Sequence, residues 1–231
     1  MGPERRLVYG RRRGRPLRRG QRVLRETLLP RLTLSLPASG PLDPSAVFAG
    51  PAREVWLEIG FGGGEHIAAL AEQHPDIGFI GCEVFENGIA KLLGEIGRRG
   101  LDNIRVFADD ARLLMAALPA ASIGRVFILF PDPWPKRRHH KRRIVSAESL
   151  DELARIMTGG AELRLATDDR DYMTLILDEA TGHPAFVWLA RRASDWRERP
   201  ADWPPTRYEQ KAQAAGRRPY FLRFARRQRP A

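Results

Sequence analysis

The sequence predicts an α/β fold in which helices cover both faces of a mostly parallel sheet. Short apolar runs at residues 54–59, 77–84, 104–108, 124–130 and 161–166 alternate with helical patterns at 64–73, 86–99, 111–117, 146–157 and 169–180. Strands that alternate with helices favour parallel pairing, because each crossover helix returns the chain to the same edge of the sheet. Two later apolar runs, 186–190 and 220–225, are expected to add edge strands and bring the total to seven.

Length and composition predict one domain with a basic arm. A chain of 231 residues with 43% hydrophobic content can bury one sizeable core. Residues 1–28 contain ten arginines opposed only by Glu4 and Glu26, and glycine or proline at positions 10, 14, 16 and 20 interrupts any periodicity. We therefore expect residues 1–28 to be a flexible basic arm and residues 29–231 to form a single domain with a basic C-terminal tail.

The charge balance indicates a polyanionic partner. Lys and Arg number 39 against 28 Asp and Glu, which gives a formal net charge of +11. Nucleic acid is the first candidate, ahead of a membrane surface. The chain has no run of about eighteen apolar residues and no secretory signal, and a single cysteine, Cys82, excludes an intrachain disulfide. We expect a cytoplasmic protein, a monomer or weak homodimer, without an obligatory protein partner; an organellar transit peptide is the less favoured interpretation of the arginine-rich start.

A glycine-rich turn follows the first predicted strand. Residues 58–64 read Glu-Ile-Gly-Phe-Gly-Gly-Gly, and glycines at 60, 62 and 64 allow a tight turn and the close approach of a ligand. The dinucleotide fingerprint would place a glycine at position 65, where Glu65 would instead repel a pyrophosphate. An acid two residues before the first glycine resembles the first motif of class I S-adenosylmethionine-dependent methyltransferases, whose cofactor carries an ammonium and a sulfonium but no phosphate. An ordinary βα turn is the alternative.

Acidic residues follow the next two strands. Glu83 ends the second strand about 20 residues past the glycines, where a carboxylate in this architecture accepts hydrogen bonds from two ribose hydroxyl groups. Phe85 follows, at a position suited to the adenine pocket. Asp109, Asp110 and Ala111 follow the third strand, where class I methyltransferases commonly place a side chain for the adenine amino group, and the spacing in that family favours Asp110 over Asp109. Helix capping is the alternative for Glu83 and Asp110.

The fourth strand ends in an acid between two prolines. Residues 131–135 read Pro-Asp-Pro-Trp-Pro, and residues 136–143 read Lys-Arg-Arg-His-His-Lys-Arg-Arg. Proline fixes its own φ and restricts the residue before it, so Asp132 should have little backbone freedom. The arrangement suits a site that holds an uncharged planar group beside a polyanion. A proline turn followed by a solvated run of charges is the alternative.

This segment and two others together resemble the tRNA (guanine-N7)-methyltransferases of the bacterial single-chain type. The matching segments are Phe-Pro-Asp-Pro-Trp-Pro-Lys at 130–136, Ala-Thr-Asp at 166–168 and Thr-Arg-Tyr-Glu at 206–209. The arginine-rich segment 10–15 is similar to the N-terminal arm of that family, and the similarity covers most of the chain. The resemblance implies a Rossmann-like class I methyltransferase fold. It also implies transfer of a methyl group from S-adenosyl-L-methionine to N7 of guanosine 46 in the variable loop of tRNA.

The resemblance assigns roles to individual residues. Cofactor contacts are expected from Glu58, Gly60, Gly62, Glu83, Phe85, Asp110, Ala111 and Asp132, of which Asp132 is also the catalytic residue. Substrate contacts are expected from Lys136, Asp168, Thr206, Arg207, Tyr208 and Glu209, and RNA contacts from Arg137, Arg138, Lys141, Arg142 and Arg143. Guanine N7 has a lone pair and no proton, so the reaction needs no obligatory general base and Asp132 should position the base and stabilise charge.

Several alternatives stay open at the level of sequence. Thr206 and Glu209 have the spacing of a capping box at the start of a helix. The histidines are not spaced with acids or cysteine as metal ligands would be, so no metal is expected. The chain is alternatively a methyltransferase for another RNA or a different substrate, or a non-catalytic RNA-binding protein on a methyltransferase fold. Four retained acids, Glu58, Glu83, Asp110 and Asp132, argue against loss of catalysis.

Overall fold

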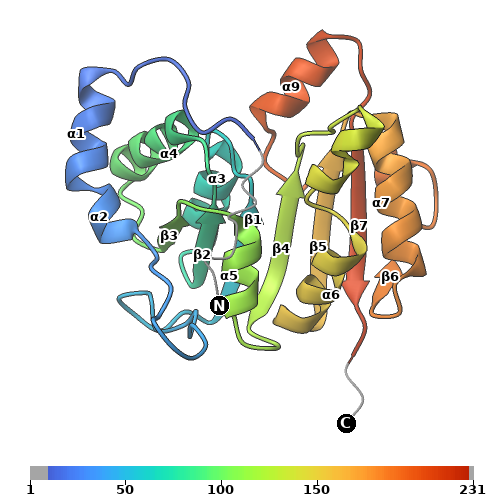
Figure 1. Cartoon of the computed structure of the whole chain (residues 1–231), viewed down its shortest axis with the longest axis horizontal. Helices are drawn as coiled ribbons and strands as arrows, with labels where there is room; N and C mark the ends of the chain where they lie inside the picture. The colour runs from blue at the N-terminus through green and yellow to red at the C-terminus, as the bar shows by residue number, and fades with distance from the viewer. Residues whose placement is uncertain (1–9, 229–231) are drawn as a thin grey trace.

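Five buried apolar strands form the parallel part of a seven-stranded sheet in the computed structural model, which describes residues 10–228. The strands are β1 (Glu54–Ile59), β2 (Ile77–Cys82), β3 (Ile104–Phe107), β4 (Ile123–Leu129), β5 (Met157–Thr167), β6 (Phe186–Trp188) and β7 (Tyr220–Arg226). Their order is β3-β2-β1-β4-β5-β7-β6, and β7 runs antiparallel to both of its neighbours (Figure 1). The predicted α/β class with a mostly parallel sheet is confirmed.

Helices cover both faces of the sheet because its central strands are apolar on both faces. Helices α3 (Glu65–Gln73) and α4 (Glu86–Arg99) pack on one face with Trp56 and Phe127. Helices α5 (Ala111–Ala117), α6 (Ala147–Ile156) and α7 (Arg170–Gly182) pack on the other face with Leu57 and Val126. Consecutive residues of a strand point to opposite faces, so Glu58 lies on the α3 face together with Trp56.

The remaining elements correct two expectations. Strand β7 is an interior strand between β5 and β6, so of the two predicted edge strands only β6 lies at an edge. The predicted flexible arm contains helix α1 (Arg19–Thr27), and α2 (Leu29–Leu32) follows directly. Leu24 and Leu28 pack on the core that α4 helps to form, which supplies the apolar burial that the arginine-rich composition concealed. Residues 1–9 of the predicted arm and residues 229–231 of the predicted tail lie outside the described residues.

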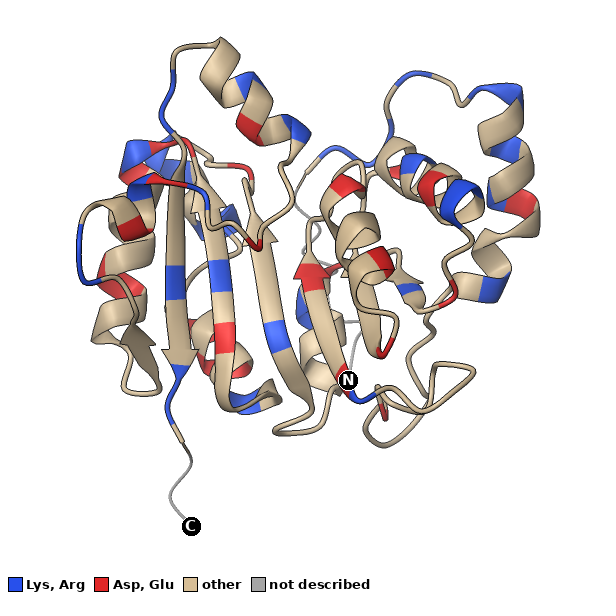
Figure 2. Ribbon diagram, turned by 180° about the vertical axis from the view of Figure 1, so that it is seen from behind, with Lys and Arg blue, Asp and Glu red and all other residues tan. Residues whose placement is uncertain are grey.

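The carboxyl ends of the parallel strands gather several further segments at one edge of the sheet. The 3-10 helix η1 (Arg137–Arg142) follows β4, α9 (Arg207–Ala214) precedes β7, and the segment 10–18 precedes α1 (Figure 1). Helix α8 (Ser194–Arg197) packs against β7. Figure 2 shows many Lys and Arg residues in the segments at this edge. None of the helices between residues 10 and 228 is long and apolar enough to cross a membrane.

Candidate functional site

A cavity of about 360 Å³ lies at the carboxyl ends of strands β1 to β4. Its walls come from the turns that follow these strands, from segment 10–11 and from α9. Residues of the predicted site that line the cavity are Gly60, Gly62, Glu83, Phe85, Asp110, Ala111, Asp132, Arg142 and Tyr208. Crevices at this edge are where parallel sheets bind ligands, because the loops there diverge and helix N-termini point toward them.

The glycine loop between β1 and α3 adopts a conformation that other residues avoid. Gly60, Gly62 and Gly64 have φ angles of 74°, 57° and 80°, in the left-handed region. A Cβ on Gly60 would meet no atom within 4 Å, so glycine at this position keeps the cavity wall open. A Cβ on Gly62 would lie 2.9 Å from Cε2 of Tyr208, because α9 places that ring against the loop. The loop is therefore shaped both by backbone conformation and by close packing.

Glu83 closes the cavity at the end of β2 and is fixed by three backbone donors. Its Oε2 accepts a hydrogen bond from the backbone N of Gly62 at 2.8 Å, and its Oε1 accepts from Val84 N at 2.7 Å and Phe85 N at 2.9 Å. Burial raises the pKa of Glu83 above its ordinary value against the effect of these donors, and the nearby charge of Asp132 raises it further. Glu83 and Asp132 thus face the same cavity.

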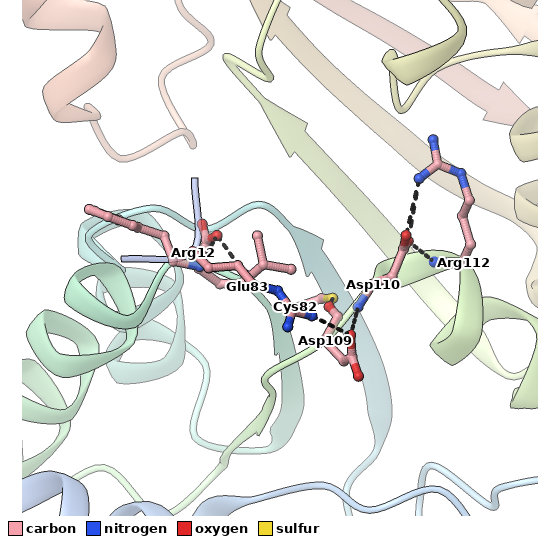
Figure 3. A network of polar contacts seen from close by, with 8 residues as sticks. Arg12, Cys82, Glu83, Asp109, Asp110 and Arg112 are labelled. Atoms are coloured by element: carbon pink, nitrogen blue, oxygen red, sulfur yellow. Dashed lines mark hydrogen bonds and ion pairs between the residues drawn. The ribbon is translucent and has the colours of Figure 1, made fainter. Parts of the chain in front are cut away.

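Asp109 and Asp110 follow β3 and are held by neighbouring groups (Figure 3). Asp110 caps α5, since its Oδ1 accepts from Arg112 N at 2.9 Å. Asp109 Oδ1 accepts from Asp110 N at 2.9 Å and from Arg12 Nη2 at 3.3 Å. The capping alternative for Asp110 is therefore correct, and both residues also line the cavity. Capping and cavity lining coexist because the cap places the carboxyl group at the strand end.

Asp132 lies between two residues with strained backbones. Phe130 and Trp134 have φ angles of 51° and 44°, which side chains with a Cβ rarely adopt. The surrounding packing holds this conformation: Phe130 N donates to Ala166 O at 2.7 Å, and Arg143 Nε donates to Pro133 O at 2.8 Å. The Asp132 side chain is accessible to solvent from the cavity, yet the protein around it displaces enough water to raise its pKa above the ordinary value.

Trp134 also lines the cavity, and the side chains of Arg142 and His139 pack against its ring. The guanidinium carbon of Arg142 lies 4.9 Å from the ring centroid, and His139 meets the ring edge-to-face at 5.8 Å. Both neighbours belong to η1, so the middle and the end of the basic run are packed against the strained segment. Arg142 thereby becomes part of the cavity wall, which its predicted role as an RNA contact did not anticipate.

Glu58 is buried beside the glycine loop and is not among the residues that line the cavity, so its predicted cofactor contact stays a prediction. Its side chain is 3% exposed, and its Oε2 lies 2.7 Å from Nδ1 of His66, which is 2% exposed. The pleat of β1 turns Glu58 toward α3, whereas Ile59 turns toward the cavity.

The Thr-Arg-Tyr-Glu segment acts locally as a helix start. Thr206 is the N-cap of α9 and accepts from Glu209 N at 3.0 Å, while the buried Glu209 pairs through Oε1 with Arg199 Nε at 3.1 Å. Arg207 Nε lies 4.0 Å from an oxygen of Glu65 at the surface. Within 206–209, only Tyr208 lines the cavity. The N-cap half of the predicted capping box is thus confirmed, whereas the Glu209 side chain pairs with Arg199 in place of the Thr206 backbone N.

The other predicted substrate and RNA contacts are distributed around the cavity mouth. Asp168, after β5, accepts from Arg217 Nε at 2.6 Å and does not line the cavity. Lys136 caps η1 and is exposed, as are Arg137, Arg138 and Lys141. Arg143 corrects the prediction, because it is 3% exposed and lies 4.7 Å above the Tyr172 ring. It is a structural residue that holds the strained segment and cannot reach RNA in this conformation.

The cavity is also lined by residues that the sequence analysis did not assign to the site. Gly10 and Arg11 line it because segment 10–15 folds across the turn after β2, where Glu86 N donates to Arg12 O at 2.9 Å and Gly14 N donates to the Asn87 side chain at 2.8 Å. No local pattern in the chain predicts this contact, which joins residues more than seventy positions apart. Within residues 10–228, no group of three or more His, Cys, Asp or Glu side chains is placed to hold a metal ion.

Solved structures of methyltransferases share this fold. An rRNA methylase from Streptococcus thermophilus superposes with a TM-score of 0.53 at 14% identity and covers 76% of this chain and 87% of its own. A precorrin-6y C5,15-methyltransferase from Geobacter metallireducens superposes with a TM-score of 0.52 at 13% identity and covers 76% of this chain and 80% of its own. At these identities the likeness concerns the fold alone, which is the Rossmann-like fold of class I methyltransferases.

Relatives in sequence narrow the family. Residues 52–222 match a family model described as "Putative methyltransferase". A tRNA (guanine-N(7)-)-methyltransferase from Rhodospirillum rubrum is 52% identical over 96% of this chain and 89% of its own length. The protein of the same name from Paramagnetospirillum magneticum is 54% identical over 98% and 95%. The methyltransferase fold, the acid-lined cavity and these matches together show that the chain belongs to the tRNA (guanine-N7)-methyltransferase family.

Proposed function

We propose that the protein transfers a methyl group from S-adenosyl-L-methionine to N7 of guanosine 46, in the variable loop of tRNA. The charge of the cavity carries this proposal. Four carboxyl groups and three guanidinium groups line it, a net negative site in a chain whose net charge is +11. A cofactor with an ammonium and a sulfonium suits an acidic cavity, whereas a polyanionic RNA suits the basic surroundings.

The residues of the cavity fit this cofactor in chemistry. Gly60 and Gly62 leave room for its methionine end, since a Cβ on Gly60 would project into open space. Glu83 is fixed by three backbone donors, which leaves one acceptor site, on Oε2, for a ribose hydroxyl group. Phe85 and Ala111 supply apolar surface for the adenine, and Asp110 supplies an acceptor for its amino group. When bound, the cofactor supplies an electrophilic methyl group.

Positioning dominates the chemistry because N7 already has a free lone pair. The reacting atoms must be held in line at about 3 to 3.5 Å, and such ordering can contribute on the order of 7 kcal/mol or more. Asp132 projects from a strained and well-packed segment into the cavity that Glu83 also faces. It would hold the guanine edge and stabilise the positive charge that the purine gains, because a carboxylate fixed in advance needs no reorganisation.

Exposed cations at the cavity mouth would bind the RNA backbone. Arg137, Arg138 and Lys141 extend from η1, the helix that contacts Trp134 of the cavity wall. Side chains cannot read the deep major groove of A-form RNA, so these contacts would go to phosphates, and the target base would have to leave its stack. A buried free cysteine and a tRNA substrate are compatible with the cytoplasm, where we place the protein.

Transfer of labelled methyl to unmodified tRNA tests the proposal. The purified protein is incubated with labelled S-adenosyl-L-methionine and tRNA transcribed in vitro, and the modified base is located by chain cleavage at N7-methylguanosine. We expect label in tRNA and one cleavage site, in the variable loop, and a transcript with adenosine at position 46 should take up no label. Label at another guanine atom, or none on tRNA while another RNA is labelled, would refute the proposed substrate.

A further inference from the structure

A second group of cations lies beside the cavity, on the face of the sheet that α3 and α4 cover. It consists of Lys91 of α4 together with Arg207 and Lys211 of α9, two helices that are far apart in the chain. Arg207 and Lys211 are exposed, and Lys91 is partly exposed. Figure 2 looks onto this face and shows Lys and Arg residues in both helices. We call these three residues the α4–α9 surface.

The cations of the α4–α9 surface are close enough to repel one another. Burial lowers the pKa of Lys91 below its ordinary value, and the charges of Arg207 and Lys211 lower it further, against the effect of Glu65. Arg207 Nε lies 4.0 Å from Oε1 of Glu65, at the start of α3. Three cations that face one acid favour a bound polyanion, because its charge would relieve the repulsion among them.

A groove of about 770 Å³ between α1 and α4 continues from this surface. The groove is lined by three cations, Arg18, Lys91 and Arg98, and by two acids, Glu65 and Glu95. Gly63 also lines the groove, whereas Gly62 lines the cavity, so the glycine loop separates the two. A strand of RNA that followed the groove would therefore pass directly beside the cavity.

The basic helix η1 lies on the other side of the cavity. Its C-cap, Arg143, packs 4.7 Å above the Tyr172 ring of α7, and the carbonyl of Arg143 accepts from Arg112 Nη2 of α5 at 3.2 Å. These contacts hold η1 on the face of the sheet that α5 and α7 cover. Helix α9 instead meets the start of α3, and Lys211 Nζ lies 5.6 Å from the ring centroid of Tyr208, which lines the cavity. The two groups of cations thus border one cavity from opposite sides.

We propose that the α4–α9 surface binds the phosphate backbone of the RNA substrate on the opposite side of the target nucleotide from η1, so that the strand straddles the cavity. The identity of the RNA rests on the proposed function. A base can enter a pocket only after it leaves its stack. Phosphate contacts on both sides of the cavity would hold the strand open at that point, because the backbone would be fixed on either side of the target nucleotide.

The combined change Lys91→Gln and Lys211→Gln tests the proposal, with the Kd for tRNA measured between about 50 and 200 mM salt. We expect the slope of log K against log salt to fall by about 1 for each lost phosphate contact. At about 150 mM salt the Kd should rise about fourfold for each contact. The pair Lys91→Arg and Lys211→Arg keeps both charges and should restore the parent Kd. The Kd for S-adenosyl-L-methionine should not change, because neither lysine lines the cavity.

Protection of tRNA phosphates from alkylation by ethylnitrosourea locates the lost contacts. The Lys91→Gln and Lys211→Gln variant should lose protection on one side of the target nucleotide, and Arg137→Gln with Arg138→Gln should lose it on the other side. Arg53→Gln is the matched control for each single lysine change. Arg53 is exposed and directly precedes β1, at the edge of the sheet opposite the cavity, so its loss should leave the Kd for tRNA and the salt slope unchanged.

The outcomes separate this inference from the proposed function. A double lysine variant with the parent Kd and the parent salt slope would overturn the inference. Loss of protection at the same phosphates as in the η1 variant would overturn it as well, because both groups of cations would then bind one side of the strand. If the parent protein protected no phosphate of tRNA at all, the proposed function would fail instead.

Discussion

Two glycines of helix α4 should respond to the same substitution in opposite ways. A Cβ on Gly88 would lie 2.2 Å from the carbonyl oxygen of Gly62, whereas a Cβ on Gly94 would meet no atom within 4 Å. Because unstrained carbon–oxygen contacts begin at about 3.3 Å, Gly88→Ala must separate α4 from the glycine loop by about 1 Å. The contact is with backbone, so no side-chain rotation can relieve it.

The magnitudes follow from this displacement. Overpacking costs about 1–3 kcal/mol, and replacing glycine in a helix returns about 1 kcal/mol, so Gly88→Ala should lower the free energy of unfolding by up to about 2 kcal/mol. Gly94→Ala should raise it by about 1 kcal/mol. The displaced glycine loop lines the cavity, so Gly88→Ala should also raise the Kd for S-adenosyl-L-methionine, by about tenfold if the lost contacts cost about 1.4 kcal/mol.

Urea unfolding followed by tryptophan fluorescence, and calorimetric titration with S-adenosyl-L-methionine, measure the two effects in parallel. Gly94→Ala serves as the control, because it makes the same chemical change in the same helix, facing open space. If Gly88→Ala stabilised the protein as Gly94→Ala does and bound the cofactor with the parent Kd, the close contact between α4 and the glycine loop would not exist as described.

Four further predictions concern the cavity and its rim. Asp132→Asn should lower the single-turnover rate by about 10²-fold or more while the Kd for tRNA is kept; loss of tRNA binding would contradict the assigned role. Desolvation raises the pKa of Asp132, so protonation on acidification should lower the turnover rate at a higher pH than it would for a fully solvated aspartate. In Asp132→Asn this fall in the pH profile should be absent. Arg137→Gln with Arg138→Gln should weaken tRNA binding and reduce the slope of log K against log salt by about 1 for each lost phosphate contact. Arg143→Gln should instead lower the free energy of unfolding by about 1–3 kcal/mol, because Pro133 O loses its buried donor, and the salt slope should not change.

Local patterns predicted the parts of the site that local geometry determines. Gly60 and Gly62 adopt positive φ angles, which favour glycine, and Glu83 comes directly after a buried strand. Their place beside the cavity could therefore be predicted from their spacing in the sequence. Asp132 was accessible because prolines on either side constrain it. The strained backbone at Phe130 and Trp134 could not be predicted from the sequence. It depends on the hydrogen bond from Phe130 N to Ala166 O and on the hydrogen bond from Arg143 to Pro133 O, which the sequence does not specify.

Long-range packing decided what the sequence could not predict. Strand β7 lies between β5 and β6 and pairs antiparallel with both. A short apolar run predicts a strand but does not specify which strands it pairs with. Helix α1 forms where glycine and arginine suggested an irregular arm, because Leu24 finds apolar surface near α4. Glu58 shares the α3 face of the sheet with Trp56, as the alternation of side chains along β1 requires, but its hydrogen-bond distance to His66 of α3 depends on packing that the sequence does not specify.

Methyl transfer to a tRNA whose target guanosine is replaced by 7-deazaguanosine tests the central claim most directly. This analogue carries a C–H in place of N7 and keeps the shape and the Watson-Crick edge of guanine, so contacts from Asp132 and the basic rim would be retained. We predict that the substituted tRNA binds with the Kd of the unmodified tRNA and accepts no labelled methyl, while the unmodified tRNA is labelled. Equal labelling of both tRNAs would contradict the assignment of N7 as the methyl acceptor.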